Sequence, residues 1–350
     1  MNRNPAGTPS GPETPRRRAT LREVSKLAGV SLKTASRVMN GEPDVGATLT
    51  AKVREAAASL DYRPNLTARN LRRKDRATRT IGVVLFDVAN AFSSTLQRAI
   101  EDTAAKRGIV VISSGVDEEP THERDNALVL IERQVDGLII VPAGDDQSYL
   151  MKDQQLGLKV VFVDRIPQLL RGDAVVSDNR GGSYRAVNHL LEVGHTRIGF
   201  LGDRDHIWTM VERRQGYFDA LRDAGIRVDE SLVRTNLHSA QEIREAIMGI
   251  VVAGKASAVF TAQNLITVES IRTLRALGLV ESIALVGFDD IETADLLVPG
   301  VTVVAQDPTV IGTFACEILL SRIDGDSSPT QTHVIPVTLI QRGSGEIPPR

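Results

Sequence analysis

The apolar residues of positions 20–60 recur at the spacing of three short α-helices. The first helix is predicted by apolar positions three and four residues apart: Leu21, Val24, Leu27 and Ala28. Thr20 stands just before them and Glu23 three residues after Thr20, a combination typical of a capping box at a helix N-terminus. Gly29 favours a sharp turn, and Ser31 is placed to cap a second helix. The pattern predicts a helix-turn-helix followed by a third helix.

A different pattern begins after Lys74, where short apolar runs alternate with amphipathic helical segments. Eight runs are predicted to be strands: TIGVVLF, IVVIS, VDGLIIVP, KVVFVD, RIGFLGD, SAVFTA, SIALVGFD and VTVVAQ. Continuous apolar runs are typical of parallel strands buried on both faces of an α/β sheet. Glycines that could act as left-handed C-caps end four of the intervening helices: Gly108, Gly194, Gly225 and Gly278. We expect an α/β fold of doubly wound parallel sheets, with too many strands for one compact sheet and therefore two similar lobes.

The second predicted helix, SLKTASRVMN, carries a cationic and polar face. Lys33 and Arg37 can donate hydrogen bonds to guanine O6 and N7. Thr34 and Ser36 can reach bases or phosphates. A helix of this composition fits the major groove of duplex DNA. The alternative is a basic three-helix bundle with no DNA role, and the charge pattern argues against it.

The charge of the chain is divided unevenly between its two parts. The formal net charge is −2, yet residues 16–76 carry +9 and residues 77–350 carry −11. A basic head on an acidic body indicates a nucleic-acid binder whose larger part has another task. No apolar stretch is long enough to span a bilayer, and residues 1–18 lack the apolar segment of a secretory signal. We expect a disordered basic arm at the N-terminus and a cytoplasmic protein with no membrane contact.

The residue types that build metal, redox and catalytic centres are scattered. Cys316, the single cysteine, lies in the apolar run TFACEILL and is expected to be a core residue. The six histidines show no ligand spacing, and neither Phe86-Asp87 nor Asp289-Asp290 has a His or Cys cluster beside it. No G-x-G-x-x-G follows the first predicted strand, and no P-loop or G-x-S-x-G elbow occurs. We therefore expect no metal, no cofactor and no enzymatic activity.

In the segments AGVSLKTASRVMN and YRPNLTARNL, the chain resembles the headpiece and hinge of the lactose-repressor (LacI/GalR) family of bacterial transcription factors. The resemblance extends over residues 20–344 through pieces such as IGVVLFDVANAF, NHLLEVGHTRIGFLGD and LVGFDD. It implies a two-lobed core like that of periplasmic sugar-binding proteins. The implied ranges are an arm at 1–18, a helix-turn-helix domain at 19–64, a hinge at 65–76, a core at 77–344 with a first lobe at 77–177 and 306–330 and a second at 178–305, and a tail at 345–350.

The resemblance also implies which residues of the headpiece and hinge contact DNA. The base-reading positions of the family fall on Leu32, Lys33 and Arg37, of which Leu32 could touch only a thymine methyl. Leu71 falls where the family inserts an apolar wedge into the minor groove, and packing on the core is the alternative. Gly46 stands where a serine is usual, which removes a cap hydroxyl from the third helix. The other expected DNA-binding residues are Thr20, Ser31, Thr34, Ser36, Asn40, Tyr62, Asn65 and Ala68.

For the core, the resemblance places effector contacts at the carboxyl ends of strands, where open α/β sheets bind ligands. The expected effector-binding residues are Asn90, Phe92, Asp164, Arg165, Trp208, Arg213, Gln263 and Asp289. Charged and amide groups suit a polyhydroxylated ligand, and Trp208 could cover a sugar or base. For each residue the alternative is a structural cap or an inter-lobe salt bridge. The pair Gln263-Asn264 departs from the Asn-Asp of many family members. At position 264 an amide replaces a carboxylate, so the side chain can donate as well as accept hydrogen bonds.

We expect a sequence-specific repressor. Its operator affinity is expected to be controlled by a small molecule, most simply a carbohydrate. One DNA-reading helix per chain implies a homodimer on a near-palindromic operator in double-stranded DNA. No heptad pattern follows Arg342, so a dimer is expected rather than a tetramer. A corepressor-dependent regulator that responds to a nucleobase or phosphorylated metabolite is the alternative. A solute-binding protein and an α/β enzyme are remote alternatives.

Overall fold

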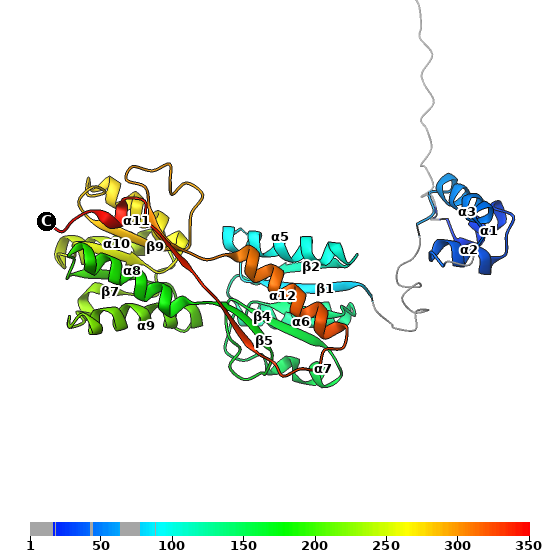
Figure 1. The fold of residues 1–350 in the computed structure, drawn as a ribbon, viewed down its shortest axis with the longest axis horizontal. Helices are drawn as coiled ribbons and strands as arrows, with labels where there is room; N and C mark the ends of the chain where they lie inside the picture. Colours follow the sequence, from blue (N-terminus) through cyan, green and yellow to red (C-terminus); the bar gives the residue numbers. More distant parts are fainter. Residues whose placement is uncertain (1–16, 18, 43–44, 64–77, 88) are drawn as a thin grey trace, which may run out of the picture. The chain divides into compact units, whose positions relative to one another are not determined.

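A computed structural model describes residues 17, 19–42, 45–63, 78–87 and 89–350. The chain divides into two units, residues 1–78 and 79–350 (Figure 1). Within the described residues no helix is long and apolar enough to cross a membrane.

The first unit is a headpiece of three helices around a small apolar core. Its helices are α1 (Leu21–Leu27), α2 (Leu32–Met39) and α3 (Ala47–Ser59). The capping box of Thr20 and Glu23 is present, Ser31 Oγ accepts the Thr34 backbone N–H, and Gly29 turns with φ of +64°. Gly46 gives α3 no side-chain cap. The predicted helix-turn-helix is therefore confirmed. Its buried core consists of Val24, Ala35, Val38, Val53, Ala56 and Ala57.

The first lobe of the second unit is a six-stranded sheet in the order β11-β5-β4-β3-β1-β2. Apolar residues of α5 and α12 pack on one face of this sheet, and those of α6 and the segment around Leu150 pack on the other. The elements are β1 (Thr80–Leu85), α5 (Ala91–Lys106), β2 (Val110–Gly115), α6 (Pro120–Glu132), β3 (Gly137–Ile140), α7 (Met151–Gln155), β4 (Lys159–Val163), β5 (Asp173–Ser177), α12 (Pro308–Ile323) and β11 (Thr332–Ile335).

The second lobe repeats this plan with the strand order β12-β10-β9-β8-β6-β7. Helices α8 and α9 cover one face, and α10 and α11 the other, as Figure 1 shows. Its elements are α8 (Asn179–Val193), β6 (Ile198–Leu201), α9 (Trp208–Asp223), β7 (Val233–Arg234), α10 (Ala240–Ile247), β8 (Ala258–Thr261), α11 (Asn264–Ala276), β9 (Ala284–Phe288), β10 (Thr302–Ala305) and β12 (Thr338–Ile340). The strand orders match position for position, so strands β4 and β9 occupy equivalent places.

The chain passes between the lobes three times. It leaves the first lobe after β5, returns between β10 and α12, and crosses again between β11 and β12 (Figure 1). Strand β11 lies in the first sheet beyond the expected limit of residue 330, and β12 pairs antiparallel with β10, unlike the other strands. The expected tail at 345–350 is in contact with the second lobe near its start. Ser344 Oγ donates to the Leu285 carbonyl over 2.6 Å and Glu346 accepts from Thr302 Oγ1 over 2.9 Å, so this segment packs on the second lobe.

Two expectations about strands need correction. The run IVVIS forms β2, but β2 is not buried on both faces, because it is the edge strand of its sheet and Val110 is 60% exposed. Strands β5, β7, β11 and β12 lie outside the eight predicted runs, because they are short or interrupted by polar residues. The four helix-ending glycines have φ between +66° and +108°, as predicted.

Candidate functional site

The exposed side of α2 presents the side chains predicted to read bases. Leu32 is 46% exposed, and Lys33 is exposed beside it. Arg37 is half-buried, and its Nε donates to Glu42 Oε2 over 2.9 Å. The ion pair orients the guanidinium at the C-terminal end of α2. The structure thus places these three side chains on one helix, with Leu32 and Lys33 exposed and Arg37 half-buried.

The other predicted DNA contacts of the headpiece have local structural roles. Ser31 and Thr34 share a hydroxyl contact of 2.9 Å at the start of α2, and Asn40 Nδ2 donates to Ser36 Oγ over 3.4 Å at its end. Thr20 caps α1, and Tyr62 is partly buried against the headpiece core. Asn65, Ala68 and Leu71 lie outside the described residues.

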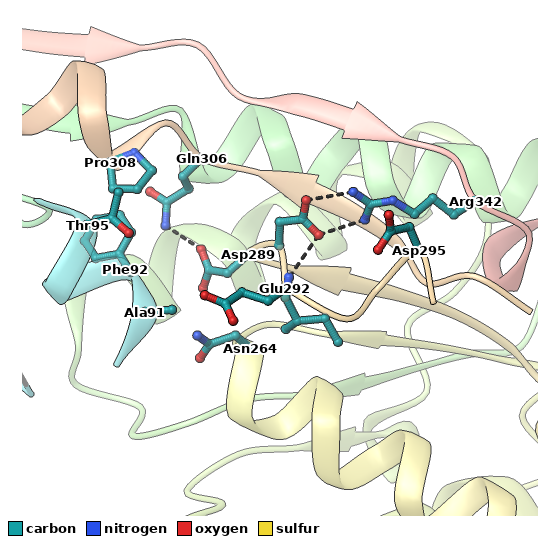
Figure 2. A pocket seen from close by; sticks show the side chains of 12 residues that line it. Ala91, Phe92, Thr95, Asn264, Asp289, Glu292, Asp295, Gln306, Pro308 and Arg342 are labelled. Carbon is teal, nitrogen blue, oxygen red and sulfur yellow. Dashed lines mark hydrogen bonds and ion pairs between the residues drawn. The ribbon is translucent and has the colours of Figure 1, made fainter. Parts of the chain in front are cut away.

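A cavity of about 50 Å³ lies between the two lobes of the second unit, at the carboxyl ends of their strands. Seven of the eight expected effector-binding residues line it: Asn90, Phe92, Asp164, Arg165, Arg213, Gln263 and Asp289. A larger pocket of about 390 Å³ adjoins it. Phe92, Asn264, Asp289 and Gln306 line both spaces, and Figure 2 shows these four side chains in the wall of the larger pocket. We call the smaller space the cleft cavity and the larger space the outer pocket.

Arg213 of α9 organises the wall of the cleft cavity from the second lobe. Its Nε donates to Asn179 Oδ1 and its Nη1 to the Ala262 carbonyl, each over 2.8 Å. Nη1 also lies 3.4 Å from Asp289 Oδ2, and the guanidinium stacks 3.7 Å from the centre of the Phe288 ring. These contacts fix the buried cation, which is 4% exposed.

Arg165, which follows Asp164 after β4, is the buried cation that the first lobe contributes to the cavity. Its Nη atoms bind both carboxylate oxygens of Glu118 at 2.6 and 2.5 Å, and Nη1 also donates to the Pro142 carbonyl over 2.8 Å. A bidentate pair of this kind is both strong and directional. Arg165 Nε is buried and has no hydrogen-bond partner among the described residues, although Asp164 Oδ2 lies 3.5 Å away.

Asp164 and Asp289 occupy equivalent positions after β4 and β9. Both have left-handed backbones, with φ of +67° and +72°. Each backbone N–H donates over 2.9 Å to the next strand of its own sheet, at Val175 and Val304. This turn directs both carboxylates into the cavity from opposite lobes. Asp289 Oδ1 also accepts from Gln306 Nε2 over 2.5 Å (Figure 2).

The two aspartates differ in their electrostatic surroundings. Burial raises the pKa of the Asp164 carboxyl above its ordinary value, although Arg165 and Arg213 oppose the shift. Its carboxylate accepts no hydrogen bond from the described residues, and the side chain is 7% exposed. A buried carboxylate without donors is costly, so a ligand that donates a hydrogen bond there would be favoured.

Trp208 does not line the cavity, although we expected it to cover a ligand. Four residues of α9 and its N-cap line the cavity: Ile207, Thr209, Met210 and Arg213. Because successive helical residues are rotated by about 100°, Trp208 projects from a different side of α9.

The sequence prediction missed other residues that line the cavity or support its lining. Glu118, Asp203 and Gln306 come shortly after strands that apolar runs predicted, a signal that could have revealed them. Asn179, which supports Arg213, follows β5, a strand that no predicted run marked, and Asn264 begins α11.

Comparisons with known proteins match both units. A family model for bacterial regulatory proteins of the lacI family matches residues 20–65, and one for a periplasmic binding protein-like domain matches residues 187–345. The HTH-type transcriptional regulator GalR of Escherichia coli (strain K12) is 31% identical over 338 residues, covering 94% of this chain and 96% of GalR. The repressor PurR of Vibrio atlanticus is 30% identical over 309 residues, covering 87% and 92%.

Solved structures agree with this assignment over nearly the whole chain. The lac repressor dimer bound to operator and the anti-inducer ONPF has a TM-score of 0.83 at 26% identity, covering 94% of this chain and 99% of that one. The CelR–cellobiose complex has a TM-score of 0.69 at 29% identity, covering 93% and 100%. A helix-turn-helix headpiece on a two-lobed binding core defines a ligand-responsive transcriptional regulator rather than an enzyme. The chain belongs to the LacI family of bacterial regulatory proteins.

Proposed function

We propose that this protein is a homodimeric, cytoplasmic repressor whose operator affinity is set by a neutral polyhydroxylated molecule, a sugar or sugar derivative, in the cleft cavity. The observation that carries the proposal is the charge balance of the cavity lining. Four carboxylates, of Glu118, Asp164, Asp203 and Asp289, accompany only two guanidiniums. Glu118 and Asp289 compensate those two cations, so a phosphate or carboxylate would meet an acidic wall.

Hydroxyl groups satisfy this lining without changing its charge. A sugar hydroxyl can donate to the Asp164 carboxylate and accept from the buried Arg165 Nε, which has no hydrogen-bond partner among the described residues. The rings of Phe86 and Phe92, stacked with their centres 6.4 Å apart, supply an apolar surface. The similarity to the CelR–cellobiose complex supports a carbohydrate. The similarity to PurR, together with the aromatic surface, makes a nucleobase the second candidate.

On DNA, α2 is proposed to lie in the major groove with Lys33 and Arg37 at base edges and Leu32 against a thymine methyl. The exposure of Leu32 and Lys33 on α2 supports this assignment. Because each chain contributes one such helix, two chains are needed to contact two half-sites. The similarity to the operator-bound lac repressor dimer supports this arrangement.

A thermal-shift screen tests the ligand proposal. Neutral sugars, sugar acids, sugar phosphates and purines are compared at concentrations far above the expected dissociation constants. A ligand at 100 times its Kd adds about 2.7 kcal/mol to folded stability, which raises the melting temperature. Arg213→Ala is expected to abolish the shift, whereas the exposed Arg227→Ala in the same lobe retains it. Stabilisation by sugar phosphates alone, or a shift that survives Arg213→Ala, contradicts the proposal.

A further inference from the structure

Two buried asparagine side chains join the lobes at the edge of the cleft cavity. Asn90 Nδ2 donates to Asn264 Oδ1 over 3.3 Å, and Asn264 Nδ2 donates to Asn90 Oδ1 over 3.2 Å. Asn90 precedes α5 in the first lobe, and Asn264 begins α11 in the second lobe. Their exposed fractions are 6% and 7%. The pair is therefore a reciprocal, buried connection between lobes that uses only atoms of this chain.

Each amide is held in position by its own lobe. Asn90 Oδ1 accepts the Phe92 backbone N–H over 3.0 Å, and Asn264 Oδ1 accepts the Leu265 backbone N–H over 2.8 Å. N–H groups of the first helical turn have no partner within the helix, so these bonds tie each asparagine to the start of its helix. The two amides consequently face each other in fixed orientations.

The asparagine pair lies between the two spaces of the site. Asn264 lines both the cleft cavity and the outer pocket, whereas Asn90 lines the cleft cavity. The cleft cavity of about 50 Å³ is far below the roughly 300–1,000 Å³ typical of ligand pockets. A sugar held within the cleft cavity alone therefore requires the lobes to move apart, and such movement separates Asn90 from Asn264.

We propose that Asn90 and Asn264 form an inter-lobe latch that holds the cleft closed and opens to admit the ligand. The proposal rests on the proposed function only for the identity of the cleft as the ligand site. An amide is required at position 264 because its Nδ2 donates to Asn90 Oδ1. A carboxylate there would set two acceptor oxygens against each other and add a fifth acid to the cavity.

Small-angle X-ray scattering of the full-length protein tests the latch. Asn264→Asp, Asn264→Ala and Asn90→Ala are each expected to increase the radius of gyration relative to wild type. The double variant Asn90→Ala/Asn264→Ala is expected to open no further than either single alanine variant, because one substitution already breaks the latch. Asn126→Ala is the matched control, since Asn126 Nδ2 donates to the Gly115 carbonyl within the first lobe.

Scattering curves of the Asn264 variants that superimpose on that of wild type would overturn the latch, as would equal opening in Asn126→Ala. Asn264→Asp keeps the side-chain volume and the acceptor for the Leu265 N–H, so it remains informative where an alanine variant unfolds. The measurement needs neither sugar nor operator. A failed latch therefore leaves the ligand proposal intact, and a blank ligand screen leaves the latch result intact.

Discussion

At the scale of single residues, Asp164 combines a cost in stability with a proposed role in binding. It is 5% exposed, and its carboxylate accepts no hydrogen bond from the described residues. Burial raises its pKa in the folded state, so folding favours the protonated form. The contribution of Asp164 to the free energy of unfolding is therefore greatest at low pH, and it falls as the pH rises through the raised pKa. Above the ordinary pKa of an aspartate, this buried carboxyl therefore lowers the stability of the folded protein relative to acidic pH.

We predict that Asp164→Asn stabilises the core at pH 7 by about 1 kcal/mol while weakening ligand binding at least tenfold, because the amide cannot ionise and offers one acceptor fewer. Urea unfolding at pH 7 and pH 4.5 measures the first effect, and ligand titration measures the second. The gain in stability is expected to shrink at the lower pH. An equal gain at both pH values would show that Asp164 does not carry the cost of ionisation.

Arg37 provides the corresponding prediction in the headpiece. Arg37→Ala is expected to cost about 1–3 kcal/mol on an operator with guanine at the contacted position, and to relax the preference for guanine there. Lys52→Ala, on the exposed side of α3, is the comparison. We expect Lys52 to contact phosphate, and the loss of a phosphate contact weakens binding to all sequences alike. Binding to operators varied at that base pair separates the two. An Arg37→Ala variant that weakens every sequence equally would assign Arg37 to the backbone.

At the scale of secondary-structure elements, the headpiece depends on its helix caps because its core is small. Thr20→Ala removes both the acceptor for the Glu23 N–H and the hydroxyl that donates to Glu23 Oε2. We predict a loss of about 1 kcal/mol in headpiece stability, with DNA affinity reduced through folding. Helical circular dichroism during thermal unfolding measures the loss. Thr48→Ala, at an exposed position near the start of α3, is the control. An equal loss of headpiece stability in this variant would show that the capping box of Thr20 and Glu23 does not stabilise the headpiece.

The elements also show what sequence patterns can predict. The helix-turn-helix was predictable because capping, apolar spacing and the Gly29 turn are local signals. The cleft residues were predictable because the family resemblance placed effector contacts on named positions, most of them at the carboxyl ends of strands. Strands β7 and β12, with two and three residues, have no periodic signal and form through pairing with distant strands. The misplacement of Trp208 arose from helix rotation, which depends on the residue at which α9 begins. The two lobes share the same strand order, but no repeat is recognisable in the amino-acid sequence.

At the scale of the whole molecule, ligand and DNA bind to separate units, each with its own apolar core. If ligand binding controls DNA binding, a conformational change must affect both sites. Within the core, a change in the relative placement of the two lobes is such a conformational change. The latch proposal makes closure partly independent of the ligand, since the Asn90–Asn264 bonds need no ligand atom. Opening or closing the cleft by mutation should then act on DNA binding without any ligand.

We predict that Asn264→Asp, by opening the cleft, changes operator affinity in the absence of ligand. If ligand binding opens the lobes, the variant and the ligand change operator affinity in the same direction. If ligand binding closes the lobes, they change it in opposite directions. Coupling energies are typically 1–3 kcal/mol, so a change of about 5- to 150-fold bounds the effect. Fluorescence anisotropy with a selected operator measures it, and Asn126→Ala should match wild type. Thermodynamic linkage adds a check. The factor by which ligand changes operator affinity must equal the factor by which operator changes ligand affinity. Unequal factors would show that the two titrations do not follow the same closed cycle, and unchanged operator affinity in Asn264→Asp would uncouple the latch from the headpiece.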